Sequence, residues 1–298
     1  MQRPALSTVA ELLKPITWFP PMWAFSCGVV SSGKPLADDW LLIIWGVLLA
    51  GPLVCASSQA VNDWFDRHVD AINEPDRPIP SGRMPGRWGF YIAVLWTVLS
   101  MLWAWPLGPW GFAATGLGLV LSWAYSMPPI RLKNNGWLGN AACGLSYEGL
   151  AWITGAAVML GGEMPTEKTL VLALLYSVGA HGIMTLNDFK AVAGDAQMGV
   201  RSLPVQLGVR AAAYTACAFM LGAQWLVAIF LWMWDSPLSA LAVLMLSFGQ
   251  LPLMARFVKS PVEKALSVSA FGVPLFVSGM MVSAWALRSL MVLEEVAT

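Results

Sequence analysis

The sequence carries little charge. Charged residues make up 11% of the 298 residues and hydrophobic residues 57%, which is far from the balance of an ordinary soluble domain. Lysine and arginine together number 17, and so do aspartate and glutamate, so the formal net charge is zero. A chain without excess positive charge gives no reason to expect nucleic-acid binding.

Cysteine is also scarce. Cys27, Cys55, Cys143 and Cys217 all fall in apolar runs, and their spacing matches no metal site. We therefore interpret them as small buried residues. A cleavable signal is lacking too, because the first apolar run is too long and has no convincing small-residue cleavage site.

The charges that are present lie in short clusters between apolar runs of about twenty residues, the length of a membrane-spanning helix. Turn residues at 106–109 and 235–237 divide two longer stretches. Nine runs result: 17–34, 40–61, 88–107, 109–127, 137–160, 168–188, 210–234, 236–257 and 266–288. We expect an all-α membrane protein, with nine transmembrane helices in a single domain over residues 1–298.

The basic residues are distributed unequally between the two faces that nine spans would create. One face carries the N-terminus and the loops after the second, fourth, sixth and eighth runs. All lysines and arginines fall there except Lys34, Lys168 and Arg288. Because basic loops stay in the cytoplasm, the N-terminus is predicted to be cytoplasmic.

The second apolar run ends in a cluster of polar residues. Asn62, Asp66 and Asp70 are spaced four apart, so on a helix their oxygen atoms lie along one face. Carboxylate and amide oxygens suit a hard cation such as Mg²⁺. A single aspartate at a helix end is more often a cap or a solvated group, but a second, similar cluster occurs later in the chain.

The sixth run ends in the same way. Asn187 and Asp188 are followed by Asp195, Arg201 and Pro204, much as the first cluster is followed by arginines and prolines. We interpret the two halves, about 17–127 and 137–257, as pseudo-repeats followed by a last helix. Asp188 and Asp195 share a face if the helix continues, although residues 193–194 could unwind it.

Basic residues surround both acidic clusters. They could bind an anion that the metal also contacts, and the alternative is that they only anchor the loops in the cytoplasm. The candidates for a diphosphate site are Arg67, Arg77, Arg131, Lys133, Lys190 and Arg201.

The stretch NDWFDRHVD resembles the first motif, N-D-x-x-D-x-x-x-D, of the UbiA superfamily of intramembrane prenyltransferases. The second motif departs from the common form D-x-x-x-D, because residue 192 is valine and the next acid is Asp195. The stretches NDFKAVAGD, LLKPITWFPPMWAF, NEPDRPIPSGRMP and YSMPPIRLKNNGWLGN are similar to the chlorophyll synthase branch of that superfamily. The run GNAACGLSYEGLAWITGAAVMLGG is closer to the bacterial members of the branch.

The resemblance implies a UbiA-type bundle of nine helices with its site on the cytoplasmic side of the inner, or intracytoplasmic photosynthetic, membrane. It implies Mg²⁺-dependent transfer of a geranylgeranyl or phytyl group from its diphosphate to the propionate of bacteriochlorophyllide a. This is the last step of bacteriochlorophyll synthesis. Association with pigment-assembly proteins would suit such an enzyme, but no residue indicates it.

The same resemblance gives roles to the remaining candidates. Asp66 and Asp188 would act in catalysis through the metal, and Tyr125, Tyr147 and Trp64 could line the cationic prenyl group. Trp64 and His181 are candidates for acceptor binding. His181 is predicted to point into the cavity of Asp188, where it could ligate the chlorin magnesium, and a hydrogen-bonded core histidine is the alternative.

Glu148 lies deep in the fifth apolar run, where an ionisable group is costly, so it is a catalytic candidate. The alternative is a structural hydrogen bond to Tyr125 or Tyr147.

Other functions stay open. A related prenyltransferase could act on an aromatic ring or a haem, but a ring acceptor must lose a proton, and Glu148 is the one candidate base. A secondary transporter would bind its ion near mid-membrane, whereas these acids lie at one face. A pigment-binding protein without catalysis would not need two aspartate clusters.

Overall fold

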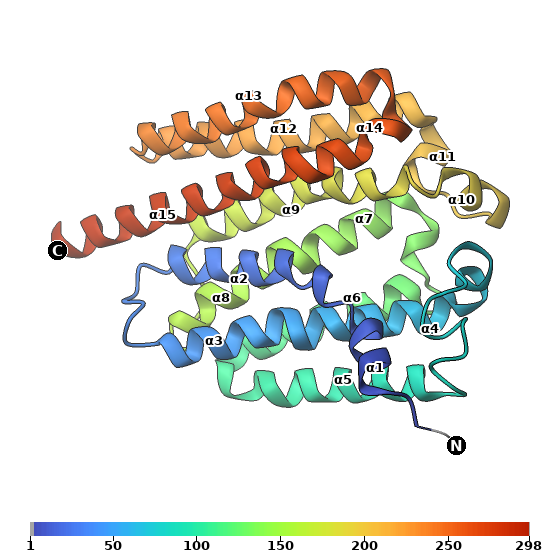
Figure 1. Ribbon diagram of the computed structural model, residues 1–298. Helices are drawn as coiled ribbons and strands as arrows, with labels where there is room; N and C mark the ends of the chain where they lie inside the picture. Colours follow the sequence, from blue (N-terminus) through green and yellow to red (C-terminus); the bar gives the residue numbers. More distant parts are fainter. Residues whose placement is uncertain (1–2, 298) are drawn as a thin grey trace.

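The computed structural model describes residues 3–297, so the predicted domain of 1–298 extends outside it at residues 1, 2 and 298. Figure 1 shows long helices lying side by side along one axis. In the described part of the chain each predicted apolar run corresponds to one helical rod. The rods are α2 (Phe19–Ser31); α3 (Trp40–Leu48), η2 (Leu49–Cys55) and α4 (Ala56–Asn73); α5 (Trp88–Ala104); α6 (Gly108–Ser126); α7 (Gly136–Gly144), η5 (Leu145–Leu150) and α8 (Ala151–Met159); α9 (Glu167–Asp188); α12 (Val209–Met233); α13 (Pro237–Lys259); and α14 (Pro261–Ser267), η6 (Val268–Gly272) and α15 (Val273–Ala297).

Short helices connect the rods. They are α1 (Leu6–Leu13), η1 (Pro15–Thr17), η3 (Trp105–Leu107), η4 (Leu132–Asn134), α10 (Val192–Met198) and α11 (Leu203–Leu207). The helices α1, α10 and α11 lie toward the same end of the bundle as the end of α4 (Figure 1).

Six helical stretches within residues 3–297 are long and apolar enough to span a membrane. This confirms an all-helical protein with several spans, while the count of nine and the orientation of the N-terminus stay predictions. Helix α2 has 13 residues and falls outside the set, as does the rod of α7 and α8. The six stretches are Trp40–Ile72, Trp88–Ser126, Glu167–Asp188, Val209–Met233, Pro237–Lys259 and Pro261–Leu293.

The second rod contains a widened π-helical turn, η2. Pro52 lies inside it, and a proline there lacks the N–H of a regular helical hydrogen bond. The wider turn accommodates this gap, so the rod continues through α4 to Asn73. As a result, the polar residues after Val61 lie on the last turns of a long helix.

Small residues bring α2 and α8 into close contact. A Cβ atom added at Gly28 would lie 2.0 Å from the carbonyl oxygen of Trp152, and one at Gly155 would lie 2.1 Å from that of Phe25. Helices in membranes often pack through such small residues, because apolar side chains gain little by leaving lipid. The contact fixes the position of α2 beside the fifth rod.

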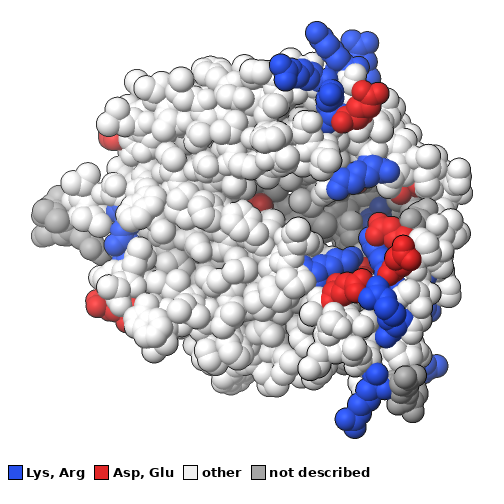
Figure 2. Space-filling view, viewed as in Figure 1, with Lys and Arg blue, Asp and Glu red and all other residues white. Residues whose placement is uncertain are grey.

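The first, second, fourth, fifth and sixth rods surround the interior cavity, and the described residues of the last three contribute nothing to its lining. Helix α12 packs on α9 and α13, and α15 packs on α13 and α2. Figure 2 shows lysine and arginine gathered at the end of the molecule that carries α10 and α11, where the surface is hollowed. The opposite end of this face shows few charges.

Candidate active site

A cavity of about 530 Å³ lies between α2, the second rod, α6, the fifth rod and α9. Its lining changes along the second rod. Asn62 in the first half of α4 is polar, as are Ser58 and Gln59 one turn before it, whereas Leu49 and Ala50 in η2 are apolar. The cavity therefore has a polar end at the acidic cluster and an apolar end deeper in the bundle.

Asp66 lies at the polar end and is held by two basic residues. Its Oδ1 accepts hydrogen bonds from Lys133 Nζ and, at 3.1 Å, from Arg131 Nη2. Its Oδ2 accepts one from Asn62 Nδ2 at 2.9 Å, one helical turn away. The spacing of four therefore brings Asn62 and Asp66 together on one helical face, as the sequence predicts. Arg131 and Lys133 reach Asp66 from the loop after α6.

Asp70 and Asp63 share one basic partner, Arg77. Arg77 Nη1 lies 2.8 Å from Asp70 Oδ2 and 3.4 Å from Asp63 Oδ1, and its Nε donates to Glu74. Lys14 Nζ lies 2.6 Å from the same Asp63 oxygen. The acids of α4 are thus paired with bases from three separate segments of the chain.

The end of α9 provides the second polar group. Asn187 lines the cavity, and Asp188 Oδ2 accepts a hydrogen bond from Asn140 Nδ2 of α7 at 3.1 Å. Asn140 also donates to Thr185 at 3.2 Å, so its amide is fixed against α9. The two Asn-Asp pairs, at 62–63 within α4 and at 187–188 at the end of α9, therefore face one cavity through Asn62 and Asn187.

Helix α9 does not continue to Asp195. It ends at Asp188, and Asp195 lies on the separate short helix α10. Burial raises the pKa of the Asp195 carboxyl, and the positive charge of Lys133 opposes that rise. Burial also lowers the pKa of the Lys133 ammonium, while Asp66 raises it. Lys133 is therefore near both acidic clusters.

The loop that carries Lys133 is fixed to the segment after α10. Gly136 N donates to Arg201 O at 2.8 Å, and Arg201 N donates to Asn134 O at 3.0 Å. The side chains of Lys190 and Arg201 are exposed beside the cavity end. Of the six predicted diphosphate ligands, Arg77 lines the cavity, and Arg131 and Lys133 bind its acidic cluster.

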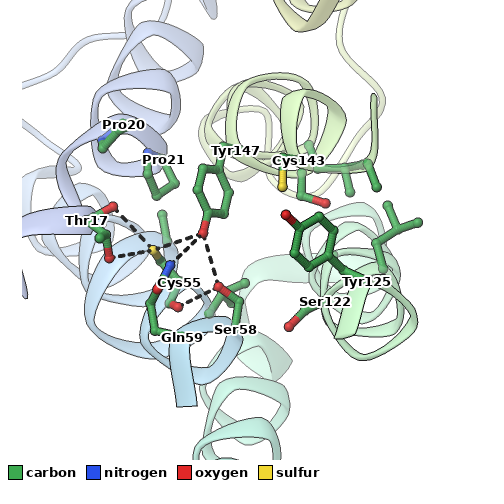
Figure 3. Close-up of a pocket in the computed structure, with 18 of the residues that line it drawn as sticks. Thr17, Pro20, Pro21, Cys55, Ser58, Gln59, Ser122, Tyr125, Cys143 and Tyr147 are labelled. Atoms are coloured by element: carbon green, nitrogen blue, oxygen red, sulfur yellow. Dashed lines mark hydrogen bonds between the residues drawn. The ribbon is translucent and has the colours of Figure 1, made fainter. Parts of the chain in front are cut away.

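Two tyrosines lie on either side of the open space, as Figure 3 shows. The Tyr147 hydroxyl accepts a hydrogen bond from Gln59 Nε2 at 3.0 Å and lies 3.2 Å from Ser58 Oγ. These bonds fix the Tyr147 ring against the cavity wall. Tyr125 lines the opposite side near Ser122, whose Oγ is buried and has no partner in the described residues.

Among the predicted site residues, Asn62, Arg77, Tyr125 and Tyr147 line the cavity and the others do not. Four of those others are Trp64, Arg67, His181 and Glu148. The Trp64 ring lies 5.6 Å from the Phe90 ring, and Arg67 is held over Trp64 with its guanidinium 4.2 Å from the ring centre. His181 does not point into the cavity as expected, because its ring stacks on Phe219 of α12 at 4.5 Å. Its Nε2 lies 3.2 Å from the Trp137 carbonyl oxygen, so it resembles the core histidine of the alternative interpretation.

Glu148 also does not line the cavity, and it lies in η5. It is 4% exposed, and its Oε2 has no partner in residues 3–297. The structural alternative, a hydrogen bond to a tyrosine, is not seen for that oxygen. The tyrosine nearest in sequence, Tyr147, bonds instead to the second rod.

The donor atoms of the acidic clusters suit Mg²⁺ in kind, since all are carboxylate or amide oxygens. Among the residues described, no three His, Cys, Asp or Glu side chains come close enough to hold a metal by themselves. Mg²⁺ usually binds through one or two carboxylates, with water and phosphate completing its shell. The site therefore fits a metal shared with a phosphate ligand better than a metal held by protein alone.

Sequence reasoning did not assign Lys14 or Asn140 to the site. Lys14 meets Asp63 across 49 positions and Asn140 meets Asp188 across 48, so only the tertiary fold brings each pair together. Asp63 was visible inside the matched motif, and it shares a helical face with Asp70, to which Arg77 connects it. Its pairing with Lys14 had no signal in the spacing.

Comparison with known proteins agrees with this geometry. Residues 17–287 match the UbiA prenyltransferase family. The chain is 55% identical over 290 residues to the bacteriochlorophyll synthase 33 kDa chain of Cereibacter sphaeroides, covering 97% of this chain and 96% of that one. It is 52% identical over 287 residues to the protein of the same name from Rhodobacter capsulatus, covering 96% and 94%.

A solved structure shares the fold. The UbiA homologue from Archaeoglobus fulgidus, bound to GPP and Mg²⁺, aligns with a TM-score of 0.68 and 18% identity over 95% of this chain and 99% of that one. The family resemblance of the NDWFDRHVD motif is thereby confirmed. The chain belongs to the UbiA prenyltransferase family.

Proposed function

We propose that this protein transfers a geranylgeranyl or phytyl group from its diphosphate to the propionate carboxylate of bacteriochlorophyllide a, releasing diphosphate. Two relatives named bacteriochlorophyll synthase are similar along nearly the whole chain. The observation that carries the proposal is the division of the cavity. Its polar end contains Asn62 and Arg77, and its deeper wall contains Leu49 and Ala50. A prenyl diphosphate is divided in the same way, into a charged head and an apolar tail.

The diphosphate would bind at the polar end. Arg77 lines the cavity there, and Arg131 and Lys133 lie beside Asp66. Arginine provides two parallel N–H donors for phosphate oxygens, and lysine provides a compact charge. Lys190 and Arg201 remain candidates from the exposed rim, and Arg67 is the least suited because it lies over Trp64.

The metal would be Mg²⁺, held together with the diphosphate. Its ligands would come from both clusters: Asn62, Asp66, Asp70, Asp188 and Asp195. When bound, Mg²⁺ would neutralise the charge that develops on the leaving diphosphate. Lys133 supports this arrangement, because it pairs with Asp66 and its charge also reaches Asp195.

In the reaction a propionate oxygen forms a bond to C1 of the prenyl group. The bond between C1 and the diphosphate oxygen breaks, and the diphosphate leaves with the electron pair. A propionate is already ionised at neutral pH, so the protein needs no general base. Its own contribution is to align the two reactants, to exclude water and to face the developing cation with the Tyr125 and Tyr147 rings.

The acceptor end is less constrained by the structure. His181 and Trp64 remain candidates for acceptor binding, although neither lines the cavity. Glu148 separates two acceptor classes, because a ring acceptor needs a base and a propionate does not. Glu148→Gln should therefore leave ester formation within a few-fold of the parent, whereas prenylation of a ring would be lost.

In the membrane we propose nine spans with the N-terminus and the polar end of the cavity on the cytoplasmic side. The basic residues gathered at that end support this orientation (Figure 2). The inner membrane, or the intracytoplasmic photosynthetic membrane, would contain both the pigment and the prenyl donor. Pigment-assembly proteins are possible partners for which no described residue provides an argument.

The direct test is to give membranes containing the protein bacteriochlorophyllide a and geranylgeranyl diphosphate, with and without Mg²⁺. Esterified pigment and released diphosphate should appear in equal amounts, and only with Mg²⁺. Phytyl diphosphate in a parallel reaction reports the donor preference. A haem or an aromatic acid that was prenylated in place of the pigment would favour the related enzymes, and no ester with Mg²⁺ present would exclude the synthase.

A further inference from the structure

Lys14 occupies a fixed position at the polar end of the cavity. It follows α1 in the left-handed backbone region, with φ 47° and ψ 67°. Its carbonyl oxygen accepts hydrogen bonds from Thr17 N at 2.9 Å and from Thr17 Oγ1 at 2.8 Å. Trp18 Nε1 donates to the preceding carbonyl, of Leu13, at 2.8 Å. The fold therefore determines where the Lys14 side chain begins.

The ammonium group of Lys14 lies between the cavity and a buried acid. Its Nζ is 2.6 Å from Asp63 Oδ1, and Asp63 is 2% exposed. Arg77 reaches the same oxygen at 3.4 Å, and both Lys14 and Arg77 line the cavity. The hydrogen bond to Asp63 uses one of the three N–H donors of the ammonium.

We propose that Lys14 binds the diphosphate head together with Arg77 and that Asp63 is a positioning residue for both. The inference rests on the proposed function. Arg77 also pairs with Asp70 and Glu74, so the wall has no surplus of positive charge, and what it offers an anion is the unused N–H donors of Lys14. Asp63 keeps both side chains paired while the cavity holds no anion, because a buried charge without a partner is costly. The remaining donors of Lys14 are then available to phosphate oxygens.

The competing explanation is that Lys14 and Asp63 only attach α1 to α4. The chain offers a matched control, because Arg83 pairs with Glu11 of α1 from the loop after α4. That pair is exposed and does not line the cavity. If attachment of α1 is what matters, loss of either pair should have the same effect.

The experiment uses the full chain in detergent with Mg²⁺ and compares Lys14→Gln, Lys14→Arg and Arg83→Gln. A lost hydrogen bond to a charged group corresponds to a change of about tenfold or more in binding. We therefore expect Lys14→Gln to raise the Kd and the KM for geranylgeranyl diphosphate by about that factor, with the KM for bacteriochlorophyllide unchanged. Lys14→Arg should recover most of the loss, and Arg83→Gln should bind like the parent.

A second measurement needs no variant. Geranylgeranyl diphosphate, and inorganic diphosphate at higher concentration, should slow acylation of Lys14 by an amine-reactive reagent, while the exposed Lys259 reacts as before. Unchanged acylation of Lys14 would overturn the proposal, as would equal loss of affinity in Lys14→Gln and Arg83→Gln. A parent protein that binds no geranylgeranyl diphosphate would overturn the proposed function itself, which the parent's own binding curve reports separately.

Discussion

Each buried acid of α4 has a basic partner from elsewhere in the chain. Asp66 pairs with Lys133 and Arg131, and Asp63 with Lys14 and Arg77. At the scale of single residues, these pairs offset the repulsion between carboxylates that lie close together on one helix. Spacing along one helix predicted that Asn62 and Asp66 would meet, because that contact is local. Arg77, Arg131 and Lys133 were predicted near the acids, but helical spacing could not predict which base pairs with which acid, nor that Lys14 joins them.

Replacing Asp66 tests the metal assignment. Asp66→Ala should lower ester formation by at least about a hundredfold, because a ligand of the metal and diphosphate is lost. It also leaves Arg131 and Lys133 without their acid, which costs about 3–5 kcal/mol when a pair is buried. Asp66→Asn keeps the volume and should lose activity with less loss of thermal stability.

The matched control for this prediction is Asp76→Ala, in the exposed loop after α4. Thermal unfolding in detergent and pigment esterification are measured on the same preparations. Full activity in Asp66→Asn would show that the carboxylate does not hold the metal.

Two variants of Tyr125 test whether its aromatic ring or its hydroxyl group contributes to the turnover rate. If the ring faces the developing cation, Tyr125→Phe should keep most of the turnover rate. Tyr125→Leu should lose roughly tenfold or more, since a cation over a desolvated ring gains about 2 kcal/mol. The measurement is kcat at saturating donor. A Phe variant as inactive as the Leu variant would assign the function to the hydroxyl instead.

At the scale of helices, periodicity predicted the rods but not their irregular turns. The second and fifth rods each contain a π-helical segment, at 49–55 and 145–150. Pro52 marks the first, but no single residue marks the second. The sixth run was predicted to end at residue 188, and α9 ends there. The turn after it, which places the segment between α10 and α11 beside the loop after α6, could not be predicted. Such turns depend on tertiary contacts rather than on local propensity.

The contact between α2 and α8 yields a prediction at this scale. Gly155→Ala would place a methyl group against the Phe25 carbonyl and push α2 away from the cavity wall. Overpacking of this kind costs about 1–3 kcal/mol, so the melting temperature and the activity should both fall.

The control is Gly222→Ala in α12, where an added Cβ meets no atom within 4 Å. Alanine also favours a helix over glycine by about 1 kcal/mol. We expect this variant to melt at or above the temperature of the parent. Equal melting temperatures for Gly155→Ala and the parent would mean that the two helices can separate at little cost.

At the scale of the whole molecule, apolar runs and their turn residues were enough to predict a helical membrane bundle. The thickness of the bilayer sets the length of a membrane-spanning apolar run, so such helices can be predicted without knowledge of the tertiary structure. The cavity could not be predicted in this way, because its wall combines short stretches of α2, the second rod, α6, the fifth rod and α9. The family motif connected the polar cluster to prenyl transfer, but it did not indicate which side chains line the wall.

The proposed orientation can be tested by labelling. Asp76→Cys lies in the loop after α4, and Glu163→Cys lies in the connection between α8 and α9. With the N-terminus cytoplasmic, a membrane-impermeant thiol reagent should label the second from outside intact spheroplasts and the first only in inverted vesicles. The four native cysteines, none of them exposed, provide the background. The reverse pattern would invert the topology.

We propose that Asp66 of α4 and Asp188 of α9 bind one metal and one diphosphate. The most direct measurement is Mg²⁺-dependent binding of a non-cleavable geranylgeranyl diphosphate analogue to the parent, Asp66→Ala, Asp188→Ala and the double variant. If both acids serve one ligand, each single change should remove most of the Mg²⁺-dependent affinity, and the double variant should lose little more. Parent-like binding by Asp188→Ala, or losses of affinity that add fully in the double variant, would show that the two acids do not share one metal and one diphosphate.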